Sequence, residues 1–310
     1  MTKRGLTATA LTIALALAGC GKSGDQPGNG AAVSDQAGGG AEAARAKLSG
    51  YTAGYNKLLD TFGLPATVKA YTEENIATAS PSDSISVTDG WLEQANTLLK
   101  TARAMPGGPA DVDAGADKLI GALDAAMKRL DGLKVYYDSK AYKEDGLKRG
   151  KQEDPAMIAE FKAAVAAMDQ FSALLDRERK TSQATDLAAM KAKGDMLGYH
   201  TKLALQQGEE LVSLFNSDAD IRNAALIAQG DAKVAVLEKT LAAQRVELGK
   251  AKASQTPEKR VDVNYELVAD RLNSAIGDYR DLKQSGETDD YNDLVGHYND
   301  AVEDANDIAG

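Results

Sequence analysis

An apolar repeat with a period of about 3.6 residues runs along most of this 310-residue chain and limits what it can fold into. The repeat starts at Glu42 and lasts to Ile308, and no stretch alternates apolar and polar residues for long enough to predict a strand. Each helix with such a pattern has one apolar stripe, which must be buried against a neighbour. We therefore predict an all-α fold, an elongated antiparallel bundle of long helices that forms one domain over residues 42–310.

Proline, glycine and capping residues divide this repeat into separate predicted helices. The predicted helical stretches are 42–62, 67–77, 91–102, 119–137, 155–215, 217–248, 257–282 and 291–308. The residues expected to open three of them are Asp154-Pro155, Ser217 with Asp220, and Thr256-Pro257. Gly194 and Gly208 lie on the apolar line of the longest stretch. They predict close approach of a neighbouring helix, with a conformational hinge as the alternative.

The first 21 residues have the layout of a processed export signal. Lys3 and Arg4 supply positive charge, residues 6–18 form a short apolar run, and Leu17-Ala18-Gly19-Cys20 resembles a bacterial lipobox. The apolar run is too short to cross a hydrocarbon core of about 30 Å. The resemblance implies that residues 1–19 are removed and that Cys20 carries a lipid such as palmitate. The alternative is an ordinary cleaved signal, in which Cys20 is incidental.

The segment that follows, residues 20–41, is rich in glycine, alanine, serine and aspartate and includes Gly38-Gly39-Gly40. Val33 is its largest apolar side chain, so burial cannot offset the entropy lost on ordering. We predict a disordered, flexible tether with an r.m.s. reach of about 25 Å. Such a tether holds the folded body clear of the membrane.

Charge and composition restrict the partners and the compartment. Removing residues 1–19 takes away Lys3 and Arg4 and no acid, which changes the formal charge from −10 to about −12. An acidic surface repels phosphate backbones, so a nucleic-acid partner is not expected. The lipid anchor predicts a protein bound to the cell membrane and facing the periplasm. Gly21 after the lipidated cysteine, in place of aspartate, favours the outer membrane of a two-membrane bacterium.

Several short motifs support a family resemblance. The segments concerned are Lys47-Leu48-Ser49-Gly50-Tyr51, Tyr55-Asn56-Lys57-Leu58, Tyr291-Asn292 and Tyr298-Asn299. Together with the lipobox and the tether, they resemble the YiiG-like bacterial lipoproteins, a domain family of unknown function. The resemblance covers roughly residues 45–307 and implies an all-helical body in the cell envelope. It supplies no catalytic residues.

The recurring tyrosine–asparagine pairs are the candidate binding face. Tyrosine joins an apolar ring to a hydroxyl, so such a face can stack on sugar rings or hold a peptide. The alternative is that these are core tyrosines, buried where the first and last helices pack together. The residues of the face are Tyr51, Tyr55, Asn56, Tyr291, Asn292, Tyr298 and Asn299.

Catalytic and metal-binding patterns are missing from the sequence. His200 and His297 each lack a second histidine or cysteine at metal-ligand spacing. The aspartates within residues 111–117 resemble the start of a calcium loop, but Ala116 and Ala122 occupy the positions that need glycine and glutamate. Neither a glycine-rich phosphate loop nor a Gly-x-Ser-x-Gly elbow is found. We therefore expect no enzyme activity, no metal and no cofactor.

Three classes of function fit these observations. The leading hypothesis is a lipid-anchored cell-envelope protein without a catalytic site, which binds a partner protein or supports an assembly through a helix face. The alternative is an envelope lipoprotein that binds a small ligand or a glycan in a pocket of the bundle. A third, less favoured hypothesis is an enzyme with an unrecognised site, which requires acids converging in a cleft.

Overall fold

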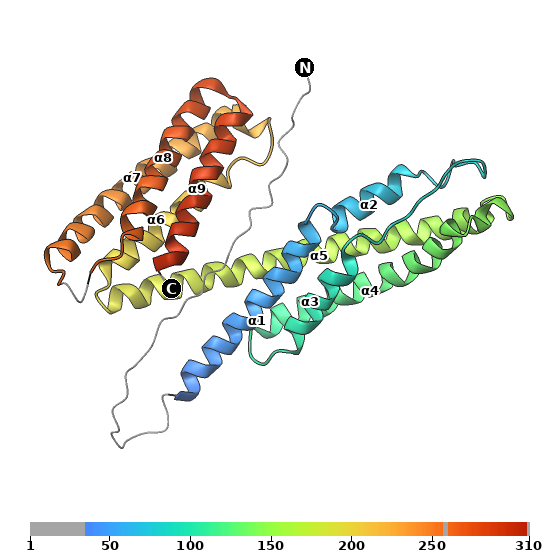
Figure 1. Ribbon diagram of the computed structural model, residues 1–310, viewed down its shortest axis with the longest axis horizontal. Helices are drawn as coiled ribbons and strands as arrows, with labels where there is room; N and C mark the ends of the chain where they lie inside the picture. Colours follow the sequence, from blue (N-terminus) through green and yellow to red (C-terminus); the bar gives the residue numbers. More distant parts are fainter. Residues whose placement is uncertain (1–34, 257–259, 309–310) are drawn as a thin grey trace. The chain divides into compact units, whose positions relative to one another are not determined.

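The computed structural model describes residues 35–256 and 260–308, and within this part every regular element is helical (Figure 1). The all-α prediction is therefore confirmed for the described chain. The export signal, Cys20 and residues 21–34 of the predicted tether lie outside it. The elements are α1 (Asp35–Leu59), α2 (Leu64–Glu73), α3 (Leu92–Ala104), α4 (Ala110–Asp138), η1 (Ala141–Lys143), α5 (Lys148–Ala192), α6 (Met196–Val212), η2 (Asp220–Arg222), α7 (Ala224–Ala253), α8 (Asn264–Ser285) and α9 (Thr288–Ile308).

The helices form two compact units, where the periodicity predicts one domain. The described part of the N-terminal unit is residues 35–180, and that of the C-terminal unit is residues 181–256 and 260–308. Helix α5 runs through the boundary between Lys180 and Thr181. No described residue of α5 beyond Phe171 is fully buried, so its second half adds no residue to either set of fully buried apolar side chains. Each unit has a core of its own.

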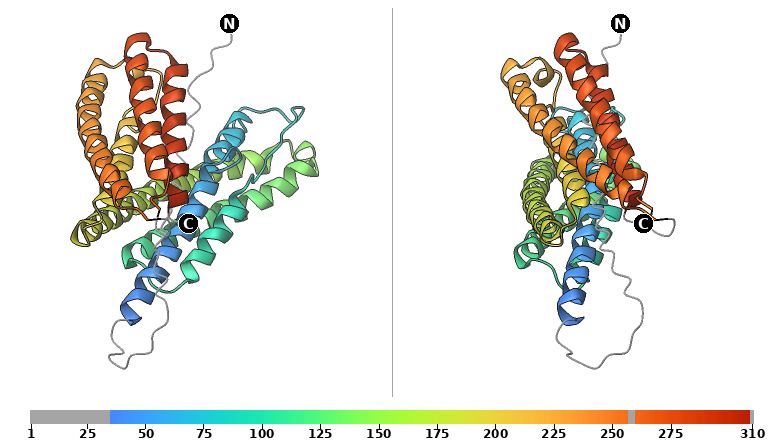
Figure 2. Two further views of the ribbon diagram at one scale, coloured as in Figure 1. Left: turned by 60° about the vertical axis from the view of Figure 1, so that its left-hand side comes forward. Right: turned by 90° about the vertical axis from the view of Figure 1, so that its left-hand side faces the viewer.

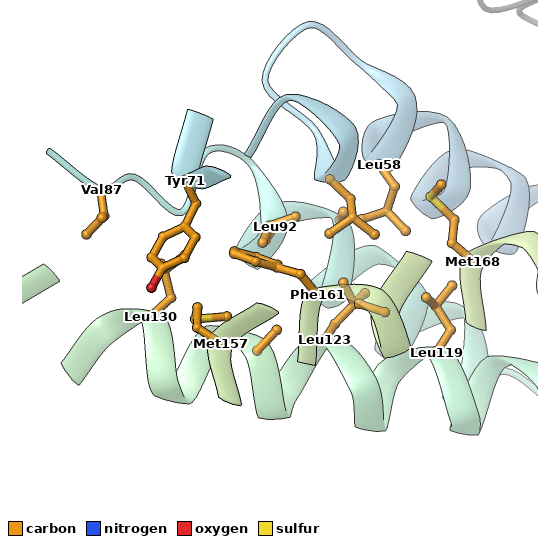
Figure 3. Packing of buried hydrophobic residues seen from close by; sticks show 14 of the residues in the cluster. Leu58, Tyr71, Val87, Leu92, Leu119, Leu123, Leu130, Met157, Phe161 and Met168 are labelled. Atoms are coloured by element: carbon orange, nitrogen blue, oxygen red, sulfur yellow. The ribbon is translucent and has the colours of Figure 1, made fainter. Parts of the chain in front are cut away.

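The core of the N-terminal unit is built where α1, α2, α3, α4 and the first half of α5 meet. Helix α1 packs on α3, and α3 packs on α4. Figure 3 shows Phe161 and Met157 of α5 reaching the same layer as Leu123 of α4 and Leu92 of α3. The rings of Phe161 and Tyr71 meet edge to face, with centroids 5.5 Å apart. One apolar stripe from each helix is thereby buried.

Two glycines let α1 and α3 approach closely. A Cβ atom at Gly50 would lie 2.9 Å from the Cβ of Ala102. At Gly54 it would lie 2.8 Å from the Leu99 side chain and 3.1 Å from the Leu99 backbone nitrogen. Side chains at these positions would push the helices apart, because packed interiors have little free space.

We expect Gly54→Ala to destabilise the protein, although alanine favours helix. Overpacking costs roughly 1–3 kcal/mol, and the gain in helix propensity is at most about 1 kcal/mol. Gly121 on α4 is the matched control, because a Cβ there would meet nothing within 4 Å. Gly121→Ala should raise the urea midpoint and Gly54→Ala should lower it. Equal shifts of the two midpoints would contradict the close approach.

The C-terminal unit consists of α6, α7, α8 and α9, with the end of α5 (Figure 2). Helix α6 packs on α7, and α8 packs on α9. The close approach predicted at Gly208 is confirmed, since a Cβ there would lie 3.0 Å from Leu272 and from Tyr298. Among the residues that the structure describes, no helix is both long enough and apolar enough to cross a membrane.

The predicted helix over residues 155–215 is wrong at both its start and its middle. It is interrupted at Gly194, which adopts a φ of +74°, and Asp195 caps α6 by accepting a hydrogen bond from the Gly198 nitrogen at 2.9 Å. Helix α5 begins at Lys148, so Pro155 lies inside it and not at its first turn. Leu147, which has a left-handed φ of +64°, precedes the helix, and its carbonyl accepts a hydrogen bond from the Lys151 nitrogen at 3.0 Å.

Other helix starts also differ from the prediction; α4, for example, begins at Ala110 and not at residue 119. Helix α1 begins at Asp35, so residues 35–41, assigned to the tether, extend a helix already held by its packing on α3. Helix α7 begins at Ala224, because the Asn223 side chain accepts hydrogen bonds from the first turn. Asp220, which is expected from the sequence to form a capping box with Ser217, instead accepts a hydrogen bond from the Asn216 nitrogen at 2.9 Å. Helix α8 begins at Asn264, and residues 257–259 are not described.

Candidate functional site

The predicted tyrosine–asparagine face is divided between the two units. Its α1 residues lie on a helix that packs mainly on α3, and its α9 residues lie on a helix that packs mainly on α8. Tyr51 and Tyr298 are buried core residues. Tyr55, Asn56 and Tyr291 are partly buried. Asn292 and Asn299 are exposed.

The hydroxyls of Tyr51 and Tyr291 have internal partners. Tyr51 donates to Asp113 Oδ1 at 2.6 Å, and its ring meets Phe171 edge to face. Tyr291 donates to the Phe215 carbonyl at 2.8 Å. Burial, assisted by the hydrogen bond to the Asp113 carboxylate, raises the pKa of Tyr51 well above its ordinary value. These contacts support the core interpretation of Tyr51 and Tyr291.

The aspartates near the start of α4 pair with cations of the chain. Asp113 accepts a hydrogen bond from Lys47 at 2.7 Å, and Asp117 accepts one from Arg103 at 2.7 Å. Asp111 pairs with Arg177. All three aspartates lie on α4. Their ion pairs connect α4 with α1, α3 and α5.

The two histidines lie apart from any metal-ligand group. His297 Nδ1 is 2.6 Å from Asp278 Oδ2, and the His200 ring lies against Tyr199. Within the described residues, no three histidine, cysteine, aspartate or glutamate side chains are arranged to hold a metal ion.

An acidic pocket lies between α3 and α4 in the N-terminal unit. Its volume is about 310 Å³. Four of its lining residues are acids and one is a lysine; the rest of the lining is polar except for one methionine. The lining residues are Asp89, Glu93, Asn96, Thr97, Lys100, Asp124, Met127 and Asp131.

Only half of these carboxylates are neutralised. Lys100 pairs with Asp124 at 2.7 Å, and Lys134 pairs with Asp89 at 3.0 Å. Glu93 and Asp131 have no ion pair among the described residues. Partial burial alone would raise the pKa of Asp89, but the hydrogen bond from Lys134 holds it below its ordinary value. The pocket is therefore negatively charged at neutral pH.

A buried amide adds a second feature to the pocket. Asn96 is 2% exposed, and its Nδ2 donates to Asp124 Oδ1 at 2.6 Å. Its Oδ1 atom is buried and accepts no hydrogen bond from the described residues. Leaving such an oxygen unpaired is costly, which is why native structures rarely do so. Amide and carboxylate oxygens together suit a ligand that donates hydrogen bonds, such as an ammonium or guanidinium group.

An aromatic pair with one exposed ring lies at the start of α3. Phe62 is 56% exposed, and its ring meets Trp91 edge to face at 5.2 Å. Lys57 Nζ lies 3.1 Å from the centre of the Trp91 ring. Trp91 falls between Asp89 and Glu93 in the chain, so the aromatic pair and the acidic pocket share the start of α3.

The sequence contains a weak signal for this pocket. Glu93, Asn96 and Lys100 recur at helical spacing on α3, and Asp124 and Asp131 lie seven residues apart on α4. Each set alone is typical of a solvated helix face, and only the packing of α3 on α4 brings them together.

Comparison with known proteins identifies a family of unknown function. A family model described as "Protein of unknown function (DUF3829)" matches residues 46–307. It supplies no site residues, and it does not bear on the narrower likeness to YiiG-like lipoproteins. Neither a curated protein nor a solved structure matches the chain.

Proposed function

This chain belongs to a family of proteins of unknown function, so the family assigns no activity to it, and we propose a function from the site itself. The protein is a lipid-anchored helical module of the bacterial cell envelope, without a catalytic site, that binds a partner protein. The acidic pocket between α3 and α4 receives a lysine or arginine side chain of that partner.

The observation that carries this proposal is that one pocket is lined by the acids Glu93 and Asp131, which have no ion pair, and by Asn96, whose buried oxygen accepts no hydrogen bond from the described residues. A cationic side chain donates several hydrogen bonds and neutralises charge, so it suits both features at once. Phe62 and Trp91 lie near the same end of α3 and offer apolar area for the surrounding contact. Aromatic residues often dominate the binding energy of protein interfaces.

The proposed location in the cell envelope depends on the N-terminal segment. Leu17-Ala18-Gly19-Cys20 supports lipidation at Cys20, and Gly21 favours the outer membrane. The motifs shared with YiiG-like lipoproteins support the same location. The body then faces the periplasm, where an acidic pocket can meet the basic surface of another envelope protein.

A second candidate function is binding of a small cationic ligand. The pocket volume of about 310 Å³ is at the lower end of the range for small-molecule sites. A linear polyamine presents the same ammonium groups as lysine. This candidate keeps the chemistry of the pocket but needs no protein partner.

In-cell crosslinking of the tagged, lipidated protein, followed by affinity purification and mass spectrometry, tests the partner proposal. We expect one reproducible partner, with capture reduced about tenfold or more by Glu93→Gln with Asp131→Asn, which corresponds to about 1.4 kcal/mol. Glu144→Gln with Asp169→Asn is the matched control, since both acids are exposed and lie outside the pocket. A Cys20→Ser form should lose the partner if the anchor places the protein beside it.

Two outcomes would contradict the partner proposal. One is equal capture by the pocket and control variants, and the other is recovery of abundant bystanders only. Spermidine then serves as the probe for the second candidate. It should raise the melting temperature of the purified protein and of the control variant, and have no effect on the pocket variant.

A further inference from the structure

Helix α7 is apolar on the side that faces away from its own unit. Its buried residues, among them Leu237, Leu241 and Leu248, share one face and pack toward α6 and α8. On the opposite face, the positions that alternate three and four residues apart from Ala225 to Ala253 are all exposed. Every one of them is alanine, valine or glycine, except Lys239. We call this set of positions the α7 seam.

The α7 seam has the spacing of a coiled-coil interface. Its average step of 3.5 residues continues over four heptads, which is long enough to indicate such an interface. Val246 in the seam is 57% exposed, and Val236 beside it is also exposed. The outer face of a surface helix in water is normally polar. An apolar face of this length, which only Lys239 interrupts, therefore calls for another helix to cover it.

The charges along one edge of the seam indicate which helix covers it. Asp231, Glu238, Arg245 and Lys252 follow one another at intervals of seven residues, acidic in the first half of α7 and basic in the second. A second α7 running antiparallel would place its Arg245 opposite Glu238 and its Lys252 opposite Asp231. We propose that α7 pairs with α7 of a second copy of this chain, antiparallel and about a two-fold axis.

The same antiparallel register also pairs the residues of the α7 seam with one another. It places Ala235 opposite Val246 of the second copy, and Lys239 opposite Ala242. The small Ala242 leaves room for the aliphatic stem of Lys239, whose ammonium group can reach water. A parallel pair would instead bring Arg245 near Lys250 of the second copy and leave the acids opposite Val236 and Ala243. The two-fold arrangement satisfies each contact twice, as in other symmetric dimers.

The edge charges remain accessible in the single chain. Asp231 pairs with Lys283 at 2.6 Å and also accepts from Tyr279 at 3.1 Å. Glu238 pairs with Arg280 at 2.6 Å, and Lys252 pairs with Glu266 at 2.5 Å. The side chains of all three edge residues are nearly half exposed, so a second cation or acid can join each pair. Arg245 has no ion pair among the described residues.

Cysteine crosslinking of the full mature chain tests the pairing and its direction. With Cys20→Ser, introduced cysteines are the only thiols. Mixing an Ala235→Cys protein with a Val246→Cys protein under mild oxidation should give a disulfide-linked pair. Either protein alone should stay uncrosslinked, because its two thiols would lie about 16 Å apart along the helix axis, beyond disulfide reach. Crosslinking of Ala235→Cys with itself would overturn the antiparallel arrangement.

Light scattering during size exclusion provides an independent readout. The proposal predicts a concentration-dependent species of twice the mass of one chain, which Ala242→Glu reduces at least tenfold. Ala242 is exposed, so the helical circular dichroism should not change. Ala189→Glu, at an exposed position of α5, makes the same chemical change away from the seam and should leave the dimer intact. A monomer at every concentration, or a dimer insensitive to Ala242→Glu, would overturn the proposal. This inference does not depend on the proposed function.

Discussion

Replacing Asp113 with alanine is expected to cost about 3–5 kcal/mol in the free energy of unfolding, because it leaves a buried cation without its partner. The Lys47 side chain is 3% exposed, and its Nζ lies 2.7 Å from Asp113 Oδ2. The Tyr51 hydroxyl donates to the other carboxylate oxygen at 2.6 Å. Both groups would lose their acceptor at once.

The opposite substitution, Lys47→Met, should cost much less. Asp113 would keep the Tyr51 hydroxyl and the nearby Arg103, whose Nη1 lies 3.4 Å from Oδ2. A methionine can also fill the space of the lysine stem. This asymmetry separates the cost of an unpaired buried charge from the net contribution of the pair. Urea denaturation followed by circular dichroism measures both changes, with exposed Asp169→Ala as the control expected to remain within about 0.5 kcal/mol.

The same contact makes stability depend on pH. Partial burial alone would raise the pKa of Asp113, but the hydrogen bonds from Lys47 and Tyr51 lower it below its ordinary value. A depressed pKa in the folded state means that the stabilisation is complete above the unfolded pKa of about 3.9 and is lost as the pH falls through the folded value. As the pH falls below about 4, the free energy of unfolding of the wild-type protein should therefore decrease more than that of Asp113→Ala. Parallel pH curves for the two proteins would contradict the role of Asp113.

The helices could be predicted from the sequence more readily than their grouping. Periodicity shows that a stripe is buried, but it does not identify the helix that covers it. The apolar line through Leu187 and Met190 therefore predicted a continued core, whereas those residues are only partly buried and both cores lie elsewhere. The break at Gly194 was missed because a glycine on an apolar line fits a close helix contact as well as a left-handed turn.

The candidate site could not be predicted from the sequence for a related reason. Asn96 and Asp124 are 28 residues apart on different helices, and nothing local marks them as partners. Lys47 and Asp113 are 66 residues apart. Tyr51 belongs to a motif that could be singled out, but its role as a core hydrogen-bond donor depends on the position of α4. Contacts between helices decide these roles, and spacing along one helix does not contain that information.

Replacing Phe161 with alanine is expected to destabilise the N-terminal unit by about 3–5 kcal/mol. The ring is 1% exposed and meets Tyr71 at 5.5 Å (Figure 3). Alanine would leave a cavity in the layer where α2, α4 and α5 converge. Phe161→Leu keeps most of the volume and should cost roughly half as much or less, because a change of shape is tolerated better than a void.

Hydrogen exchange measured by mass spectrometry on the full chain locates this effect. Because the two units have separate cores, Phe161→Ala should speed exchange in peptides from α1, α3 and α4. Peptides from α7 and α8, which belong to the other core, should keep their protection. A compact unit with its own core can unfold while its neighbour stays folded, as in the local unfolding of other proteins. Uniform loss of protection over all the helices would instead mean that α5 makes the two units one cooperative structure.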